Sequence, residues 1–418
     1  MLTRFEIDNF KSLVEFSLPG VGTAPLGQFV CLVGLNGSGK STVLQALDFV
    51  SQLAVGDVNK WLAMRGWEKK ELVNKSTKKR SIVFTLVFKD RLGELVWNGS
   101  YNYLQDRCTK EELVFTPNIN SSSKVLPKEP VSFQSDSGSI RGSGGFRRDI
   151  ESEYSGSIFN RLKTKSIGSI EHAGNVVLLL RYFLLGVKSL ELLSPHSMRK
   201  RSKKAVDLGL GGESLAAFVY GLSGGEKDTL FNEIVKFYPK LQGVSSKTGP
   251  FGWKRFLVSE KYDSTMELDA RHINDGLLRI AAIVAQTVAL SAGQKKVAKS
   301  AGGDGDEGNP DQKGYQFVLL DEIENGINPE LIERLVKYLL TVRQQIFVTT
   351  HSPLILNFLP DDVAKDSIFV LYRCASGSTK VCRFFDIPEA ASRLDAMGPG
   401  EVFLDVRLED LSSRLSCQ

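Results

Sequence analysis

The stretch Gly34-Leu35-Asn36-Gly37-Ser38-Gly39-Lys40-Ser41 decides how the rest of this sequence is read. It matches the pattern G-x-x-x-x-G-K-[S/T], in which closely spaced glycines let the backbone wrap around phosphate groups. A short apolar run, residues 28–33, precedes it, and residues 42–53 have the spacing of an amphipathic helix. A strand that runs into a glycine loop and then into a helix is the context in which this motif binds a nucleotide.

The motif predicts a role for its charged and polar residues. Lys40 is expected to reach the β- and γ-phosphates of ATP, and the Ser41 hydroxyl to coordinate Mg²⁺. Backbone N–H groups of the loop and of the helix N-terminus are expected to donate to the phosphates. The predicted nucleotide-binding residues are Gly34, Asn36, Gly37, Ser38, Gly39, Lys40, Ser41 and Thr42.

Two further motifs lie far along the chain. Residues 317–320 are four apolar residues, typical of a buried strand, and Asp321 and Glu322 follow directly. This order predicts that Asp321 enters the magnesium shell and that Glu322 is the base that polarises the attacking water. A second apolar strand, residues 346–349, is followed by His351, which we expect to contact the γ-phosphate from the end of that strand.

These motifs, together with Asp8-Asn9-Phe10-Lys11-Ser12 near the start, resemble those of ABC-type ATPases related to RecF, SMC proteins and the OLD (overcoming lysogenisation defect) ATPases. The resemblance covers residues 1–50 and about 273–405. It implies an α/β fold of the P-loop NTPase type, with a mixed sheet, an antiparallel β lobe and an inserted helical lobe. It also implies the positions of three segments: the D-loop at 324–329, the switch-histidine segment at 349–353 and a closing segment at 398–401.

An ABC ATPase needs a signature loop that binds the γ-phosphate of the ATP held by the opposite subunit, and the sequence offers two candidates. Residues 222–227, Leu-Ser-Gly-Gly-Glu-Lys, are close to the usual pattern. Ser223 and Glu226, however, also have the spacing of a capping box at the start of an amphipathic helix. Residues 274–279, Asn-Asp-Gly-Leu-Leu-Arg, are a looser variant that resembles the form seen in OLD-type ATPases.

Position favours the second candidate. The signature helix should be buried and should lead on to the strand at 317–320. The residues after Gly276 are almost wholly apolar and have that strand as their next structured element, whereas the helix after Gly225 is amphipathic and ends at Pro239. The predicted signature residues are therefore Asn274, Asp275 and Gly276.

Composition restricts the class of protein. The 418 residues are 42% hydrophobic and 24% charged, and the net charge of +5 permits contact with nucleic acid without requiring it. No apolar run reaches the roughly 20 residues that span a bilayer, and polar residues break up the N-terminus, so we expect a cytoplasmic protein without a membrane partner. Five scattered cysteines and four scattered histidines predict neither a disulfide framework nor a zinc site.

We expect three regions along the chain. Residues 1–115 form one half of the ATPase core with the glycine loop and an antiparallel sheet, and residues 266–418 form the other half. Residues 116–265 are expected to be a flexible loop, rich in Ser, Gly and Pro over 118–145, followed by an inserted helical lobe. A polar linker is predicted at 292–314.

The resemblance implies head-to-tail association of two subunits, since each glycine loop needs the signature of another chain. Stand-alone ATPases of this kind resemble those of anti-phage defence systems (Septu, PARIS and retron-associated ATPases), where they act as sensor or scaffold for a separate toxin or nuclease. Control of such an effector is our leading hypothesis. The alternative is a DNA-binding repair ATPase of the RecF type that closes on a duplex.

A third hypothesis is a nuclease site in the middle of the chain, which offers only scattered acids such as Glu151 and Glu153. The 67 residues after His351 (418 − 351) are too few for the nuclease domain that OLD proteins append, so we expect no nuclease in this chain. The basic run 199–204 could contact phosphates, but it has no interleaved aromatic residues. We interpret it as a solvated helix end or loop.

Overall fold

The computed structural model describes residues 1–20, 22–56, 58–118, 126–136, 138–149, 154–162, 172–192, 194–205, 207–300, 316–406 and 411, with backbone alone for 263–265 and 292–300. The chain forms two compact units. Unit 1 comprises residues 1–187, 362–397 and 402–418, and unit 2 comprises residues 188–361 and 398–401. Within the described residues, no helix is both long and apolar enough to cross a membrane.

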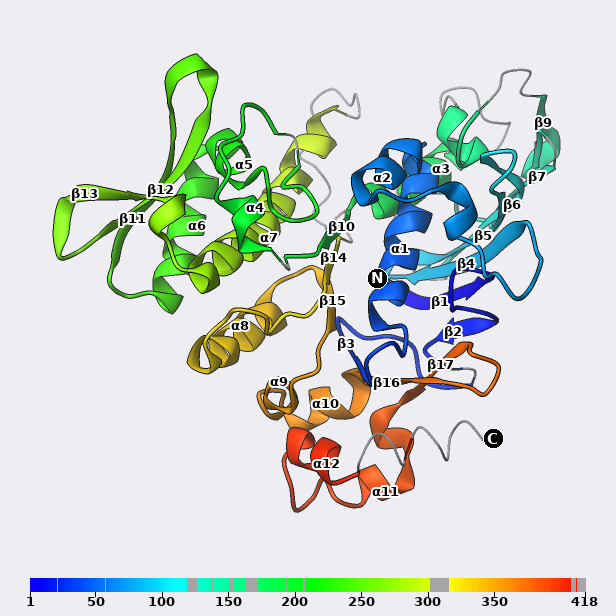
Figure 1. Ribbon diagram of the computed structural model, residues 1–418. Helices are drawn as coiled ribbons and strands as arrows, with labels where there is room; N and C mark the ends of the chain where they lie inside the picture. The colour runs from blue at the N-terminus through cyan, green and yellow to red at the C-terminus, as the bar shows by residue number, and fades with distance from the viewer. Residues whose placement is uncertain are drawn as a thin grey trace. The chain divides into compact units, whose positions relative to one another are not determined.

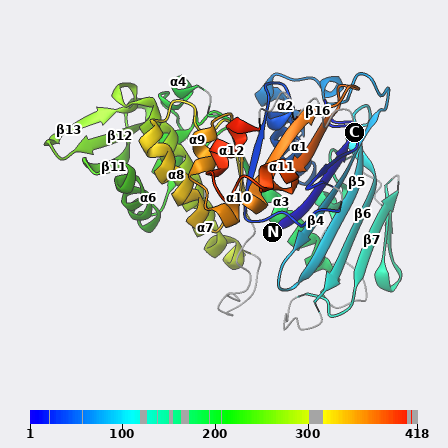
Figure 2. The same ribbon diagram turned by 90° about the horizontal axis from the view of Figure 1, so that it is seen from below.

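The largest sheet of unit 1 is antiparallel. Its strands are β1 (Leu2–Asp8), β2 (Phe16–Leu18), β4 (Ser81–Lys89), β5 (Gly93–Asn102), β6 (Arg107–Pro117), β7 (Val131–Asp136), β8 (Ser139–Gly142) and β9 (Phe146–Asp149). Their order in the sheet is β2-β1-β4-β5-β6-β7-β8-β9, and Figure 2 shows β4 to β7 side by side. Burial alternates residue by residue along β5, as expected when one face of a sheet packs on a core and the other is solvated.

Aromatic side chains fill the space between this sheet and the helices of unit 1. Those from the N-terminal half of the chain are α1 (Lys40–Val55), α2 (Val58–Arg65) and α3 (Ala173–Leu185). Phe49 of α1 meets Tyr101 of β5 edge to face, with ring centroids 5.3 Å apart. Phe183 of α3 stacks on Phe88 of β4 at 4.5 Å. These contacts fix α1, and with it the glycine loop at its N-terminus, to the antiparallel sheet.

A second, smaller set of strands in unit 1 joins the two ends of the sequence. β3 (Phe29–Gly34) pairs in parallel with β16 (Ile368–Arg373), which pairs antiparallel with β17 (Thr379–Arg383). Every residue of β3 is buried, as is usual for a strand of a parallel sheet. The strand that leads into the glycine loop is therefore held by residues more than three hundred positions further along the chain.

Unit 2 contains parallel strands with long helices. β14 (Phe317–Leu320) pairs in parallel with β15 (Gln345–Thr349), and β10 (Val187–Leu190) lies on the other side of β14. The helices are α7 (Asp275–Ser300), α8 (Pro329–Thr341) and α9 (Pro353–Asn357). The Asn328 side chain caps α8, and Pro329 occupies its first turn.

The rest of unit 2 is a small sheet with three helices, drawn in green in Figure 1. The antiparallel strands are β11 (Leu241–Thr248), β12 (Lys254–Glu260) and β13 (Asp263–Asp269). The helices are α4 (Pro195–Met198), α5 (Leu215–Gly221) and α6 (Gly224–Phe237). The remaining helices, in the C-terminal part of the chain, are α10 (Asp361–Ser367), α11 (Pro388–Ala391) and α12 (Pro399–Asp405).

Three predictions of local structure are wrong. Residues 118–145, predicted as a loop from their composition, contain β7 and β8, because Val131 and Phe133 alternate with polar residues and bury one face. The inserted lobe within 116–265 is not purely helical, since it contains most of the β11–β13 sheet. The linker begins later than residue 292, because α7 runs to Ser300.

Parts of two predictions lie outside the described residues. These are the remainder of the linker, residues 301–314, and the acids Glu151 and Glu153. The domain limits at residues 115 and 265 stay predictions.

Candidate functional site

The glycine loop of unit 1 has room only for glycine at two of its positions. A Cβ added at Gly34 would lie 2.4 Å from the carbonyl oxygen of Leu371 in β16. Gly39 has φ +107°, and a Cβ there would lie 2.4 Å from the Thr379 hydroxyl oxygen. The loop is therefore pressed against the β16–β17 hairpin, and the spacing of its glycines follows from that close approach.

The inside of the loop fits a polyphosphate. Lys40 is 5% exposed, and its ammonium donates hydrogen bonds to the carbonyl oxygens of Gly34 at 2.9 Å and Leu35 at 3.0 Å. The Ser38 hydroxyl is buried without a hydrogen-bond partner among the described residues. α1 begins directly after Gly39, so its first N–H groups point into the loop. A folded-back cation, a buried hydroxyl and a helix N-terminus are the donors that phosphate oxygens require.

Three residues outside the motif hold the loop in shape. The Thr379 hydroxyl donates to the Ser38 carbonyl at 2.8 Å and lies 2.9 Å from the Ser12 hydroxyl, which is left to donate to it. The Arg373 guanidinium donates to the Gly37 carbonyl at 2.8 Å. Sequence reasoning missed Thr379 and Arg373, since neither belongs to a motif. Ser12 could have been found from the sequence, because it is the last residue of the Asp8–Ser12 segment that resembles the family.

The other predicted loop residues lie at the surface or at its edge. Asn36 and Gly37 are exposed, and Ser41 and Thr42 are half-buried in the first turn of α1. Lys11 donates to the Gln45 side chain of α1 at 3.1 Å and lies 3.1 Å from the centroid of the Trp67 ring. The segment that carries Lys11 and Ser12 therefore contacts both α1 and the loop.

In unit 2, one hydroxyl joins the two acids that follow β14. The Thr349 hydroxyl, at the end of β15, donates to Asp321 Oδ1 at 2.5 Å and accepts from the Glu322 backbone N–H at 2.8 Å. Asp321 is 9% exposed. Because parallel strands end at the same edge of a sheet, β14 and β15 bring these three residues together. The sequence places Thr349 in the switch-histidine segment but does not predict this positioning contact.

Glu322 and His351 meet at the same edge. Glu322 has φ +48°, an uncommon backbone conformation for this residue type, and its carboxylate accepts a hydrogen bond from the Asn325 side chain. His351 Nε2 lies 3.8 Å from Glu322 Oε1. The His351 backbone N–H donates to Glu324 at 2.7 Å. The structure thus gathers the predicted base, the predicted γ-phosphate contact and the D-loop residue Asn325.

The predicted signature residues form the first turn of α7. The Asn274 side chain accepts from the Leu277 N–H at 2.8 Å, and Asn274 and Asp275 are exposed. Gly276 is buried: a Cβ there would lie 3.2 Å from the Tyr238 hydroxyl and 3.3 Å from the Gly326 carbonyl. This turn therefore packs directly on the D-loop of the same unit.

The rival candidate begins a different helix. Ser223 and Glu226 form the predicted capping box, with the Ser223 N–H donating to Glu226 at 2.5 Å. This box starts α6, whose buried residues Leu230, Ile234 and Phe237 lie on one face, as an amphipathic helix predicts. The choice of Asn274–Gly276 as the signature stays a prediction.

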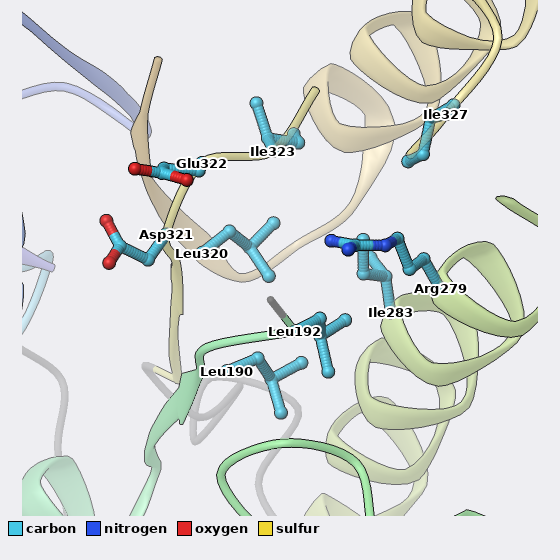
Figure 3. Close-up of a pocket in the computed structure, with 9 residues that line it drawn as sticks. All are labelled: Leu190, Leu192, Arg279, Ile283, Leu320, Asp321, Glu322, Ile323 and Ile327. Carbon is cyan, nitrogen blue, oxygen red and sulfur yellow. The ribbon is translucent and has the colours of Figure 1, made fainter. Parts of the chain in front are cut away.

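Figure 3 shows an apolar recess beside the acids, lined by Leu190, Leu192, Arg279, Ile283, Leu320, Asp321, Glu322, Ile323 and Ile327. The carboxylates of Asp321 and Glu322 point away from it, so the recess is not where these acids act. Arg279 is 5% exposed, and burial lowers the pKa of its guanidinium, whereas Asp275 and Glu322 raise it. A Cβ at Gly326 would lie 3.1 Å from Arg279 Nε, so this arginine packs on the D-loop as well.

The predicted site residues fall into both units. The glycine loop with Lys40 and Ser41 belongs to unit 1, and the acids, His351 and the Asn274 turn belong to unit 2. That these groups act on one nucleotide stays a prediction from their motifs.

Comparison with known proteins gives matches of three kinds: a protein family, a curated protein and solved structures. The chain matches the family described as "AAA domain, putative AbiEii toxin, Type IV TA system" over residues 29–91 and 105–357, which is most of its length. Among curated proteins it is similar to an "OLD nuclease" of Thermus scotoductus, at 34% identity over 110 residues. That match covers 26% of this chain and only 18% of the relative.

Among solved structures, an SMC head bound to the C-terminal winged-helix domain of ScpA is similar at 14% identity with a TM-score of 0.51. The alignment covers 91% of this chain and 96% of that one. An SMC head domain from Thermotoga maritima aligns at 11% identity over 91% of this chain and 98% of that one, with a TM-score of 0.44. At such identities the first likeness shows the fold alone.

Proposed function

Because the chain belongs to this AAA-domain family and is an ATPase of the ABC type, related to the RecF, SMC and OLD class, we propose that it is an ATP-driven switch. Two copies close head to tail around two ATP molecules. Closure controls a separate effector, a toxin or nuclease, in an anti-phage defence system. The family description, which names a toxin and a type IV system, supports this direction, as does the similarity to a segment of an OLD nuclease.

In the proposed site the glycine loop binds the phosphates of ATP. Lys40 turns from the loop carbonyls to the β- and γ-phosphates, and the Ser38 hydroxyl gains the partner it lacks. Ser41 and Asp321 are the residues that would hold Mg²⁺, which when bound neutralises charge on the β- and γ-phosphate oxygens. Ser41 and Asp321 both offer oxygen atoms and neither offers sulfur, which suits a hard cation such as Mg²⁺.

Hydrolysis in this proposal depends on Glu322. Its carboxylate takes a proton from the water that attacks the γ-phosphorus, while the bond from that phosphorus to the ADP oxygen breaks. Asn325 orients Glu322 through a hydrogen bond to its carboxylate, and Thr349 does so through a hydrogen bond from its backbone N–H. In this proposal His351, 3.8 Å from the same carboxylate, contacts the transferred phosphoryl group.

The observation that carries the switch is the packing of the signature turn on the D-loop. Gly276 lies against the Gly326 carbonyl, and Gly326 lies against Arg279 of the same helix. One residue before Gly326, Asn325 holds the Glu322 carboxylate. A γ-phosphate that arrives from a second subunit at the exposed turn therefore acts on the loop that orients the base. Catalysis becomes conditional on pairing.

A mixing experiment tests the pairing. Lys40→Ala disables the glycine loop of one copy, and Asp275→Trp places a bulky side chain on the exposed signature turn of another, away from the buried contact of Gly276 with the D-loop. Each variant alone should be inactive, but a mixed dimer contains one complete site. An equimolar mixture should then recover about a quarter of the wild-type ATPase rate, since half of the dimers are mixed and each has one site of two. Recovery of no activity would refute the head-to-tail site.

A second experiment tests the effector. The Glu322→Gln variant with ATP and the Lys40→Ala variant are used as baits in the native host, with the neighbouring genes intact. A toxin or nuclease should be retained by one variant and not by the other. Retention of the same proteins by both variants contradicts ATP control of an effector. ATP-dependent retention of duplex DNA by Glu322→Gln, with no protein, would instead favour the RecF-type function.

A further inference from the structure

The basic run of residues 199–204 is built into the fold of unit 2. At its start, Arg199 pairs with Asp275 and donates to the Ile273 carbonyl at 2.9 Å. In its middle, the Ser202 carbonyl accepts from the Lys254 N–H at 2.8 Å, so the run pairs with β12. The run is a largely exposed loop after α4, as the sequence predicts, but it is tied to the sheet at Ser202. The backbone is fixed along the sheet, and its lysine side chains are presented from a defined position.

The fold also supplies the aromatic residues that the run lacks in sequence. Lys203 Nζ lies 5.1 Å from the centroid of the Trp253 ring. Lys254 Nζ lies 3.8 Å from the Tyr220 ring, and Lys227 Nζ lies 5.6 Å from the same ring. Trp253 is 38% exposed and Tyr220 is 43% exposed. Together with Phe251, these residues are called the aromatic–lysine patch: Lys203, Tyr220, Lys227, Phe251, Trp253 and Lys254.

Phe251 is the most exposed member of the patch. It lies in the turn between β11 and β12, is 91% exposed and has φ +58°. The turn is closed by hydrogen bonds between Gly249 and Trp253 and between Trp253 and Pro250. A large apolar side chain in a left-handed conformation costs free energy, of the order of 1–3 kcal/mol, and here it is not offset by burial within the chain. The exposed ring of Phe251 is therefore better suited to contact a ligand than to pack within the chain.

The six residues of the patch include three lysines and no acidic residue. Among the residues that the structure describes, no carboxylate forms an ion pair with Lys203, Lys227 or Lys254. By contrast, Lys69 pairs with Asp106 at 2.8 Å and Lys79 with Asp8 at 2.6 Å. The patch therefore combines ammonium groups that have no carboxylate partner among the described residues with aromatic side chains that are partly exposed.

The pKa of the Tyr220 phenol is consistent with the positive charge of the neighbouring lysines. Its hydrogen bond with Thr248, and then the positive charge of Lys254, hold the pKa of Tyr220 below its ordinary value. Lys254 also donates to the Thr248 hydroxyl at 2.6 Å, which fixes its ammonium beside the ring. The lysine and the aromatic ring are thus held together before any ligand arrives.

We propose that the aromatic–lysine patch binds a single strand of nucleic acid, with its ammonium groups on the phosphates and its rings stacked on the bases. Interleaved cations and exposed rings are the two elements of single-strand binding, because every base has a face on which a ring stacks. A duplex hides those faces, so it would use the lysines alone. Neither element recognises the sugar, so DNA and RNA strands should bind alike.

This inference does not depend on the proposed switch. All six residues belong to unit 2, and none of them is in the nucleotide-binding residues or the predicted signature turn. Binding should therefore occur without ATP and should be unchanged in the Lys40→Ala variant. If the two subunits do not pair head to tail, we still expect the patch to bind a single strand. If the patch does not bind a single strand, the proposed ATP-driven switch is unaffected.

The test uses fluorescence anisotropy of a labelled oligodeoxythymidylate about 20 nucleotides long, somewhat longer than the ~4–16 nucleotides of compact single-strand sites. Trp253→Ala and Phe251→Ala should each weaken binding by about 5- to 150-fold, the effect of losing one base–ring stack. Trp253→Phe keeps a ring and should stay within about twofold of the wild type. Lys203→Ala and Lys254→Ala should each reduce the slope of log K against log salt by about 0.7.

The matched control is Lys337→Ala on α8, a lysine of the same unit whose side chain is 66% exposed and paired with Glu333. Its affinity and salt slope should equal those of the wild type. Circular dichroism melts of all variants show whether each is folded. Oligouridylate of the same length should bind within a fewfold of the DNA strand.

Three outcomes would overturn the inference. The first is equal affinity for a duplex of the same length, because stacking would then play no part. The second is wild-type affinity of folded Trp253→Ala and Phe251→Ala together with equal competition by polyglutamate, which would identify a surface for acidic proteins. The third is a strong preference for only one sugar, which would place the recognition elsewhere.

Discussion

Thr349 is the residue on which the geometry of both acids depends. A single hydroxyl donates to Asp321 and accepts from the Glu322 N–H, so one rotamer of one side chain orients a predicted metal ligand and a predicted base. Thr349 itself is fully buried at the end of β15. A positioning residue of this kind acts through its neighbours, and its loss is expected to change turnover more than binding.

We predict that Thr349→Val lowers kcat for ATP hydrolysis by about 10- to 100-fold and changes the affinity for ATP little. Valine keeps the shape of the side chain but removes the hydroxyl, which leaves Asp321 Oδ1 and the Glu322 N–H without this partner. Thr349→Ser retains the hydroxyl and should keep most of the activity. Steady-state kinetics with nucleotide titration separate the two parameters. Full activity of the folded valine variant would show that Thr349 does not position the acids.

At this scale the motifs of the sequence assign expected chemical roles to residues, but they do not indicate which other residues hold them in place. Lys40 and Glu322 belong to motifs whose spacing follows from the geometry of phosphate binding. Thr379 supports the loop through a contact with Ser38 that spans 341 positions, and nothing in its local sequence indicates this. Its role arises from the pairing of β3 with β16, which a periodicity argument does not reach.

At the scale of elements, α6 and α7 show why the same short pattern has different consequences. Both begin with a polar residue followed by glycine, but Gly224 is exposed with nothing within 4 Å of an added Cβ. Gly276 is buried between Tyr238 and Gly326. The difference comes from tertiary packing, so the sequence ranks the two candidates only by the apolar character of the residues after each glycine.

We predict that Gly276→Asp abolishes ATP turnover and that Gly224→Asp leaves it within about twofold of the wild type. An added side chain at Gly276 must displace the D-loop, whereas at Gly224 it enters open space in the first turn of α6, where a negative charge is favourable. Measuring the ATPase rate of both folded variants checks the prediction. The reverse pattern would make residues 222–227 the signature.

A buried carboxyl connects β6 to the segment that follows the antiparallel sheet. Glu111 accepts hydrogen bonds from Trp97 Nε1 at 3.2 Å, from the Ser157 hydroxyl at 2.5 Å and from the Ile158 N–H at 2.7 Å. Burial raises the pKa of Glu111 to about 7, although these hydrogen bonds act in the opposite direction. The folded chain therefore holds the Glu111 proton more tightly than the unfolded chain does.

This raised pKa predicts that stability falls with pH. The contribution of Glu111 is fully present below the ordinary carboxyl pKa near 4.5 and is lost as the pH rises through about 7. The free energy of unfolding should decrease over this window by an amount of the order of 3 kcal/mol. Glu111→Gln does not titrate, so its stability should change less between pH 5 and pH 7.5. Urea unfolding followed by tryptophan fluorescence measures the free energy of unfolding of the wild type and of Glu111→Gln. If this free energy decreases equally with pH in both proteins, another group causes the effect.

At the scale of the whole molecule, the predicted site draws on both units, and the sequence predicts this division only in outline. The α/β class, the helix after the glycine loop and the parallel strands that carry the acids agree with the sequence. The β7–β9 strands and the β11–β13 sheet do not emerge from it. These strands are short or rich in polar residues, so their alternation of apolar and polar residues is weak as a signal, and pairing with neighbouring strands stabilises them.

We predict that Glu322→Gln binds ATP and remains a dimer, because it keeps the binding groups but lacks the base that ends the closed state. Lys40→Ala should bind no nucleotide and stay at the mass of the apo protein. Light scattering on a sizing column with ATP and Mg²⁺ distinguishes the two. If Glu322→Gln hydrolyses ATP at the wild-type rate, another residue is the base. If Glu322→Gln binds ATP but stays monomeric, the mechanism does not require two subunits to pair.

The pairing of β3 with β16 has a consequence for how the protein is made. Gly34 leaves the ribosome early, but its neighbour Leu371 is added 337 residues later (371 − 34), which at ~5–20 residues per second is a delay of roughly 20–70 s. Until then the nascent glycine loop has neither its strand partner nor the Thr379 contact. We therefore expect the glycine loop to reach its final shape only after β16 and β17 have been synthesised, late in translation.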